Sequence, residues 1–181
     1  MRATRNGYMF IGWWTATSGG SQIYDASGRY KPNSRCWTAD GLWKHEGNAA
    51  LYARWLPITL GGNANWTLQG DGAWKSGTIG NSQSTWLQTV VNGAGTVTFH
   101  WKASCEWNDS YDWDLLEWTV DGIRQGKIGE RTASGTWKAV SLRIDGSGTH
   151  TIRWNYRKDG SNYDGSDCGW IRNVYWSGSV Q

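Results

Sequence analysis

GTHTIRWNYRKDGSNYDGSDCGWIRNVYW, residues 148–176, contains two strand patterns joined by a polar loop. Apolar and aromatic side chains occupy every second position from Ile152 to Tyr156, which is the period of a half-buried strand. The loop from Lys158 to Asp167 consists almost entirely of Gly, Ser, Asn and Asp, and a second apolar run then closes the chain. A loop of this kind between two strands is typical of a binding site and equally of a long hairpin connection.

The same alternation recurs upstream of this stretch. Further strand patterns cover residues 86–91, 96–104, 115–121 and 135–144, each flanked by Gly, Asn, Ser or Asp, and no helical periodicity appears anywhere. Many short strands at close spacing predict an all-β chain, an antiparallel β-sandwich of jelly-roll type. The side chains expected in its core are Val97, Phe99, Trp101, Leu116, Trp118, Val120, Val140, Leu142, Ile144, Ile152, Trp154 and Tyr156.

The opposite parity of these strands is polar. Such a face is either a concave ligand-binding surface or, more commonly, the solvated side of a sheet with cross-strand charge pairs. Its members are His100, Lys102, Glu117, Thr119, Ser141, Arg143, Arg153 and Asn155.

Tryptophan takes the place of aliphatic residues in this composition, with 16 Trp among 181 residues. Trp is rarely buried completely, so we expect some rings at the surface, where they suit sugar stacking or a protein interface. The net charge is only +3 and the basic residues are scattered, which argues against nucleic-acid binding. No run approaches the length of a membrane span, so no membrane insertion is expected, and the first ten residues lack the apolar core of a signal peptide.

A change in composition near Leu56 and Pro57 predicts two modules, residues 1–56 and residues 57–181. Proline cannot donate to a strand ladder and restricts the residue before it, so this pair is a natural boundary. In the first module, residues 18–20 read as a turn between short strands and residues 51–55 as a closing strand.

The first module carries the motifs GYMFIGWWTATSGG and LYARW. With these it resembles the internalin-type B repeat, also called the Listeria–Bacteroides repeat, a small β-grasp-like module of bacterial surface proteins. That family has a further strand before the GY motif, whereas only six residues precede Gly7 here. The resemblance therefore implies an N-terminally truncated repeat, with an unpaired sheet edge or possible self-association through a strand from another chain.

Residues 58–177 carry SGTIGNSQSTWLQTVVNGAGTVTFHWKASCE, WTVDG and the stretch quoted first. These motifs resemble a β-sandwich module, loosely similar to MAM and laminin-G-like jelly rolls, of secreted and surface proteins of bacteria. The resemblance implies an extracellular or bacterial cell-surface location and an adhesive or carbohydrate-binding role. It supplies no catalytic motif.

Three cysteines, an odd number without a CxxC pair, argue against a zinc site. We predict one disulfide between Cys105 and Cys168, because both follow or precede a strand beside a polar loop, and a lone thiol at Cys36. An oxidised pair would place the protein outside the cytosol.

Oxygen donors in the last loop make calcium the candidate cofactor. The candidate ligands are Asp159, Asp164 and Asp167, although their spacing is not that of an EF-hand. Ser161 and Ser166 lie beside them, and a neighbouring loop offers Asp109, Asp112 and Asp114 to complete the shell.

Aromatic residues in the same two loops predict a sugar platform. If Cys105 bonds Cys168, the loops lie side by side, and rings next to carboxylates suit a polysaccharide or glycan. The alternative is that two of the tryptophans only cover the open end of the sandwich. The predicted ligand-binding residues are Trp107, Tyr111, Trp113, Tyr163 and Asp112.

Catalysis is the competing hypothesis. Glu106 and Glu117, or an aspartate of the 108–114 loop, would serve as the acid and base of a glycoside hydrolase. The three histidines have no nucleophile-elbow sequence near them. We therefore predict non-catalytic adhesion through carbohydrate, with a small polysaccharide-active hydrolase and a structural spacer without a ligand as the alternatives.

Overall fold

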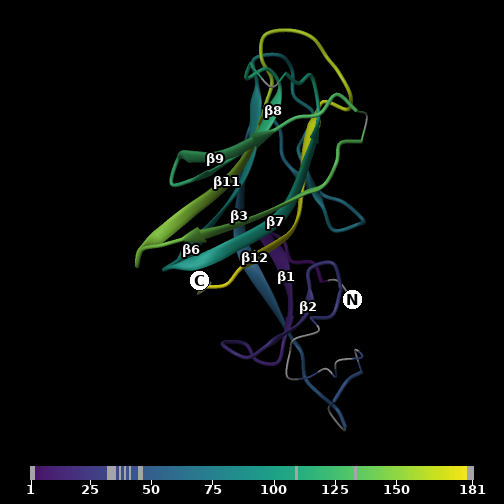
Figure 1. The fold of residues 1–181 in the computed structure, drawn as a ribbon, viewed down its shortest axis with the longest axis vertical. Helices are drawn as coiled ribbons and strands as arrows, with labels where there is room; N and C mark the ends of the chain where they lie inside the picture. Colours follow the sequence, from purple (N-terminus) through teal and green to yellow (C-terminus); the bar gives the residue numbers. More distant parts are fainter. Residues whose placement is uncertain are drawn as a thin grey trace.

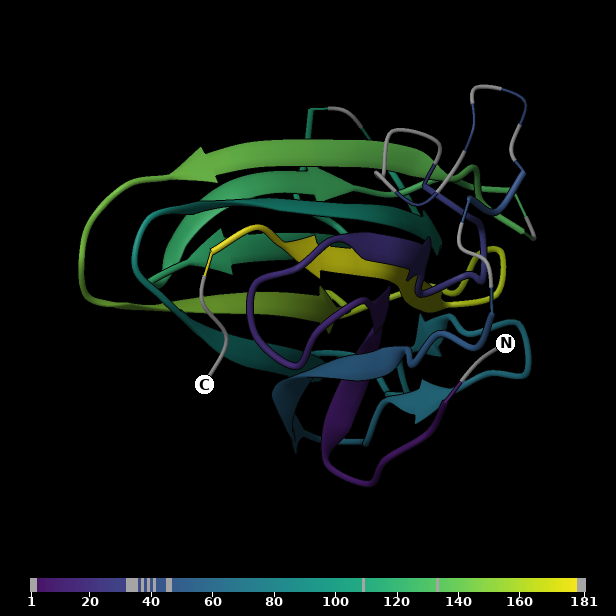
Figure 2. The same ribbon diagram turned by 90° about the horizontal axis from the view of Figure 1, so that it is seen from below.

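The computed structural model describes residues 3–31, 36, 38, 40, 42–44, 47–108, 110–132 and 134–178, and every regular element in this part is a β-strand. Two antiparallel sheets form a β-sandwich, which confirms the predicted fold class (Figures 1 and 2). The strands are β1 Tyr8–Trp14, β2 Gln22–Asp25, β3 Tyr52–Gly62, β4 Thr67–Leu68, β5 Trp74–Lys75, β6 Ser84–Asn92, β7 Gly95–Ser104, β8 Leu115–Val120, β9 Ile123–Ile128, β10 Lys138–Ile144, β11 Thr149–Arg157 and β12 Cys168–Trp176. None of the described residues belongs to a helix that could span a membrane.

The larger sheet has the strand order β2-β1-β3-β6-β11-β8-β9, and the smaller one has the order β10-β7-β12-β5-β4. Strand β11, the first half of the 148–176 stretch, is an interior strand of the larger sheet between β6 and β8. The second half forms β12 in the smaller sheet, so the polar loop between them crosses from one sheet to the other at the end of the sandwich (Figure 1).

The predicted core parity is confirmed. Of the twelve side chains expected inside, ten are buried, and the other two, Val140 and Leu142, pack against them from the edge strand β10. Phe99 is edge-on to three tryptophan rings, with centroids 5.8 Å from Trp101, 5.0 Å from Trp118 and 5.2 Å from Trp154. Indole rings thus fill the space that aliphatic side chains usually occupy, and edge-to-face geometry adds to their area burial.

Strand β3 joins the front of the chain to the sandwich. Its first half pairs with β1, where Tyr52 lies opposite Trp14, and its second half pairs with β6, where Ile58 lies opposite Thr89. The expected boundary between residues 56 and 57 falls inside this strand. Met9, Ile11, Trp14 and Leu56 belong to the same apolar cluster as the residues of the sandwich.

The predicted disulfide is wrong, because Cys105 and Cys168 are both buried free thiols, as is Cys36. Cys168 lies opposite Ser104 in the β7–β12 ladder, so the pleat directs Cys105 and Cys168 to opposite faces of that sheet. The Cys105 Sγ instead contacts the carbonyl of Asp114 at 3.2 Å. Burial raises the pKa of the Cys105 thiol to about 12 and that of Cys168 to about 11, which keeps both protonated at neutral pH.

Candidate functional site

Three loops meet at the end of the sandwich where β8 begins, the upper end in Figure 1. They connect β7 to β8, β9 to β10, and β11 to β12, and the ladders place the ends of these strands together. We call this region the loop end. It contains most of the residues that the sequence singled out.

A buried ion triad lies beneath the loop end. The Nζ of Lys158 is 2.6 Å from Oδ2 of Asp114 and 2.7 Å from Oδ2 of Asp167, and the side chains of Lys158 and Asp114 are fully buried. Asp114 continues the inward parity of Leu116, and Lys158 continues that of Tyr156, so two strands that read as apolar each end on a buried charge. Mutual pairing is what makes such burial tolerable.

Burial raises the pKa of Asp114, because the hydrogen bonds from Lys158 and from the Asp159 N–H offset only part of the lost solvation. Burial alone would lower the pKa of Lys158, but its hydrogen bonds to Asp114 and Asp167 outweigh that effect and raise it. The raised pKa favours the ammonium over the free amine at Lys158.

Arg131 joins the loops that the disulfide was expected to join. Its Nε donates a hydrogen bond of 3.0 Å to the carbonyl of Trp107 and lies 3.7 Å from a carboxylate oxygen of Asp164. Its guanidinium also lies over the ring of Trp113, 5.7 Å from the centroid. The loops at residues 105–114 and 158–167 are thus adjacent through an arginine, and not through the disulfide on which the expectation depended.

Two tyrosine rings stand at the surface of the loop end. Tyr111 is 61% exposed and stacks on Trp113 with centroids 5.9 Å apart and planes 8° from parallel. Tyr163 is 69% exposed, and the buried Nζ of Lys158 lies 4.3 Å from its centroid. Each ring is supported on one side by the protein, and this leaves most of its remaining surface to solvent.

Trp107 lies deeper than the tyrosines and is half-buried. A Cβ placed on Gly129 would come within 2.3 Å of its ring, so the indole packs directly on that glycine. The Nζ of Lys127 lies 5.6 Å from its ring centroid. Trp107 therefore packs within the loop end, and its role as a sugar-binding residue stays a prediction.

Asp112 is engaged in ion pairs. Lys127 and Arg124 donate to its two oxygens, Arg124 at 2.7 Å, and Arg157 lies 3.4 Å away. These hydrogen bonds lower the pKa of Asp112 to about 2. The carboxylate fixes the base of the 108–114 loop to β9 and β11.

The Asp112 pairs predict an acid-sensitive loop. A depressed carboxyl pKa adds stability above the unfolded-state value, and that stability is lost as pH falls through the folded value, here between about 4 and about 2. We expect Asp112→Asn to lower the melting temperature at neutral pH, and the difference from wild type to vanish in that acid window. Asp145→Asn, at a carboxylate whose side chain is 80% exposed, is the control and should show no comparable effect. Thermal melts across pH are the measurement.

The three predicted calcium ligands have separate partners. Asp167 pairs with Lys158, Asp164 accepts from the N–H of Gly165 at 2.8 Å, and Asp159 accepts from the N–H of Ser161 at 2.9 Å. Across the described ranges no three His, Cys, Asp or Glu side chains gather as a metal site. Asp109 lies outside those ranges. The ammonium of Lys158 takes the position between carboxylates that a cation would need, and the calcium set stays a prediction.

The two glutamates of the hydrolase hypothesis have different surroundings. Glu106 is 8% exposed at the loop end and accepts a hydrogen bond from Asn162 at 3.2 Å. Glu117 lies on the outer face of the larger sheet, where it accepts from Asn155 at 3.1 Å and lies 3.4 Å from Arg124. They share no hydrogen-bond partner among the described residues.

The polar side chains predicted to point away from the core lie on the outer faces of both sheets. Glu117, Thr119, Arg153 and Asn155 line a depression of about 550 Å³ on the larger sheet, while β7 carries His100 and Lys102 on the smaller one. Trp86 also lines this depression, although no pattern in the sequence gives a reason to choose it. It lies opposite Asn155 in the ladder between β6 and β11. The Arg153 guanidinium lies 4.3 Å from the Trp86 centroid and is itself held by Gln88, so a cation occupies that ring.

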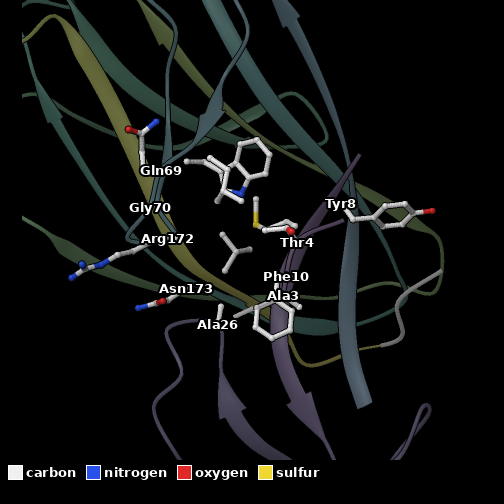
Figure 3. Close-up of a pocket in the computed structure, with 14 residues that line it drawn as sticks. Ala3, Thr4, Tyr8, Phe10, Ala26, Gln69, Gly70, Arg172 and Asn173 are labelled. Atoms are coloured by element: carbon white, nitrogen blue, oxygen red, sulfur yellow. The ribbon is translucent and has the colours of Figure 1, made fainter. Parts of the chain in front are cut away.

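An apolar cavity of about 240 Å³ lies between β1 and the segments around β4, β5 and β12 (Figure 3). Tyr8 points away from it, and Arg172 and Asn173 extend outward from its other side in that view. Its lining is mainly apolar, and the described residues that line it include no pair of acids or bases.

Comparison with known proteins supports the fold. No family model and no curated protein matches this chain. Among solved structures, the chain is similar to the secreted serine protease VesC from Vibrio cholerae, with a TM-score of 0.55 and 18% identity over 70% of this chain and 26% of that protein. The chain thus spans about a quarter of that protein's length.

Weaker similarities reach the K1 cleaved adhesin domain of Lys-gingipain from Porphyromonas gingivalis W83, at a TM-score of 0.46 and 10% identity over 67% of this chain and 90% of that one. The C-terminal CBM6 of LamC from Zobellia galactanivorans follows at 0.34 and 13% identity, over 63% of this chain and 90% of that one. At these identities the likeness concerns the β-sandwich fold alone.

Proposed function

We propose that this protein is a non-catalytic carbohydrate-binding or adhesion module and that the loop end is its glycan site. The observation that carries the proposal is the pair of exposed rings, Tyr111 and Tyr163, each backed on one side by Trp113 or Lys158. They stand on two loops that Arg131 and Lys158 hold together.

The chemistry of the loop end suits a sugar. An aromatic ring contacts the C–H face of a pyranose, and polar groups at its border take up the hydroxyl hydrogen bonds. Arg131 and Asp164 offer a donor and an acceptor at that border, and both are more than a third exposed. Rings that are already supported lose little conformational entropy on binding.

An extracellular or cell-surface setting belongs to the same proposal. It rests on the resemblance of residues 7–55 and 58–177 to modules of bacterial surface proteins, since the buried free thiols remove the argument from a disulfide. The resemblance of residues 7–55 also leaves self-association, through a strand supplied by another chain, as a prediction.

Removal of either tyrosine ring is expected to weaken glycan binding. A glycan array with the full chain would identify ligands, and isothermal titration with Tyr111→Ala and Tyr163→Ala should then show about fivefold weaker binding for each, because one stacked ring contributes about 1 kcal/mol. Tyr30→Ala and Tyr52→Ala remove exposed rings from the front of the chain and serve as matched controls.

No binding to any glycan on the array, or equal losses from the control variants, would contradict the proposal. Release of reducing sugar from polysaccharides, abolished by Glu106→Gln or Glu117→Gln, would favour the hydrolase alternative instead.

A further inference from the structure

The contact between Lys158 and Asp114 places an amine against a carboxyl group in a sealed site. The Nζ lies 2.6 Å from Oδ2, and neither side chain has any exposed surface. Bulk water that would solvate the two groups and favour their separation is kept from this contact, and the groups are held next to each other.

The backbone fixes this encounter from both sides. Asp114 directly precedes β8 and Lys158 directly follows β11, and these strands pair with Leu115 opposite Arg157. Both side chains continue the inward parity of their strands, so they are cross-strand neighbours. Reaction would require little movement of either backbone.

The carboxyl group of Asp114 is arranged as an electrophile. Its Oδ1 accepts the backbone N–H of Asp159 at 2.9 Å, a donor placed where negative charge would develop when an amine adds to the carbon. Burial raises its pKa and thereby favours the neutral acid, the form in which an oxygen can leave as water.

Asp167 is arranged as the base. Its Oδ2 lies 2.7 Å from the same Nζ, and its Oδ1 is buried without a hydrogen-bond partner among the described residues. Its side chain is 17% exposed, so a proton received there has a route to solvent. Asp167, the residue directly before β12, has a backbone φ of +47°, which is uncommon for a residue other than glycine.

We propose that Lys158 and Asp114 condense spontaneously into an intramolecular amide bond between the two side chains. The Lys158 ammonium gives one proton to Asp167, and the free amine attacks Cγ of protonated Asp114. The new C–N bond replaces the C–O bond of the acid, whose oxygen leaves as water with its own proton and a second proton from the nitrogen. Asp167 ends as the neutral acid, and neither oxidant nor external reagent is needed.

The bond would tie the ends of β8 and β11 together directly under the loops that carry Tyr111 and Tyr163. It would replace a buried ion pair by a neutral amide, and one carboxylate would no longer need a counter-ion inside the core. A covalent ring of this kind restricts the unfolded chain as a disulfide does, without depending on redox conditions.

The mass of the purified full chain tests the proposal directly. We expect the intact protein to be lighter than its sequence by one water molecule. Trypsin should then release a branched peptide that joins residues 103–124 to residues 158–172, because the modified Lys158 is no longer a cleavage site. This measurement on the wild type does not depend on the folding of any variant.

Matched variants locate the bond. Lys158→Arg and Asp114→Ala should have the full mass of their own sequences, and Asp167→Asn should retain the reactive pair but lose water far more slowly. Lys138→Arg, at an exposed lysine on β10, should still be lighter by one water. Circular dichroism of each variant distinguishes loss of the reaction from loss of the fold.

A succinimide at an Asp-Gly step such as Asp121-Gly122 would also remove one water. That product reopens in mild alkali and persists in Lys158→Arg, whereas the proposed amide survives alkali and is absent from that variant. The proposal is overturned if aged, folded wild-type protein keeps its full mass and trypsin cuts after Lys158, since the triad is then an ion pair only. Glycan binding is measured separately, so either proposal can fail alone.

Discussion

Replacement of Lys158 by methionine is expected to lower the free energy of unfolding by about 3 to 5 kcal/mol, the usual cost of removing one partner from a buried charge pair. Asp114 is fully buried and Asp167 is 17% exposed, and without the ammonium they would face each other as uncompensated carboxylates. If the wild type carries the amide between Lys158 and Asp114, the loss is larger, because the variant then lacks a cross-link as well. Urea unfolding at neutral pH, followed by tryptophan fluorescence, is the measurement.

A triple variant separates charge from packing. Lys158→Met with Asp114→Asn and Asp167→Asn removes all three charges, and the side-chain amide oxygen introduced at position 114 would still accept the Asp159 N–H. This variant should be more stable than Lys158→Met alone. A single variant as stable as wild type would mean that the triad contributes nothing to folding.

Truncation of Trp154 to alanine is expected to destabilise the protein by about 3 to 5 kcal/mol, as is usual for a large core ring that leaves a cavity. Its side chain is fully buried on β11, an interior strand of the larger sheet, edge-on to Phe99. Thermal or urea unfolding measures the loss. Trp86→Ala, one strand away on the outer face, is the control and should cost clearly less.

Trp154→Phe provides the sharper comparison. The indole N–H of Trp154 is buried without a hydrogen-bond partner among the described residues, so phenylalanine keeps an aromatic ring and removes an unsatisfied donor. We expect this variant to lie much closer to wild type than Trp154→Ala. Equal losses in the two variants would show that the ring is not what stabilises the core.

The sandwich core could be predicted because alternation is a local signal. Once the inward parity of Phe99, Trp118 and Trp154 was recognised, the burial of the flanking residues followed. Strand β9 was missed because IRQGKI is polar and lies at the edge of the larger sheet. The signal for it was the Asp121-Gly122 pair, whose positive φ values of 51° and 82° form the tight turn of a β-hairpin.

The loop end was predicted in part. The sequence placed residues 105–114 beside residues 158–167 only through a disulfide between Cys105 and Cys168; the two loops do meet, but without that bond. What joins them was not predictable, because Arg131 comes from a third loop and its contact with Asp164 depends on tertiary structure. The cysteines misled because a one-residue difference in register decides whether two thiols share a face. Asp114 and Lys158 look like ordinary loop residues in the sequence, because no local pattern shows that their side chains pair and become buried.

The sharing of strand β3 has a consequence for how the protein opens. One uninterrupted backbone donates hydrogen bonds to β1 along its first half and to β6 along its second. Amide protons of β1 and of the first half of β3 can therefore exchange when the front hairpin detaches, whereas those of the second half of β3 become accessible only when β3 separates from β6. In hydrogen-exchange terms, protection is expected to rise along β3 at the point where its partner changes from β1 to β6.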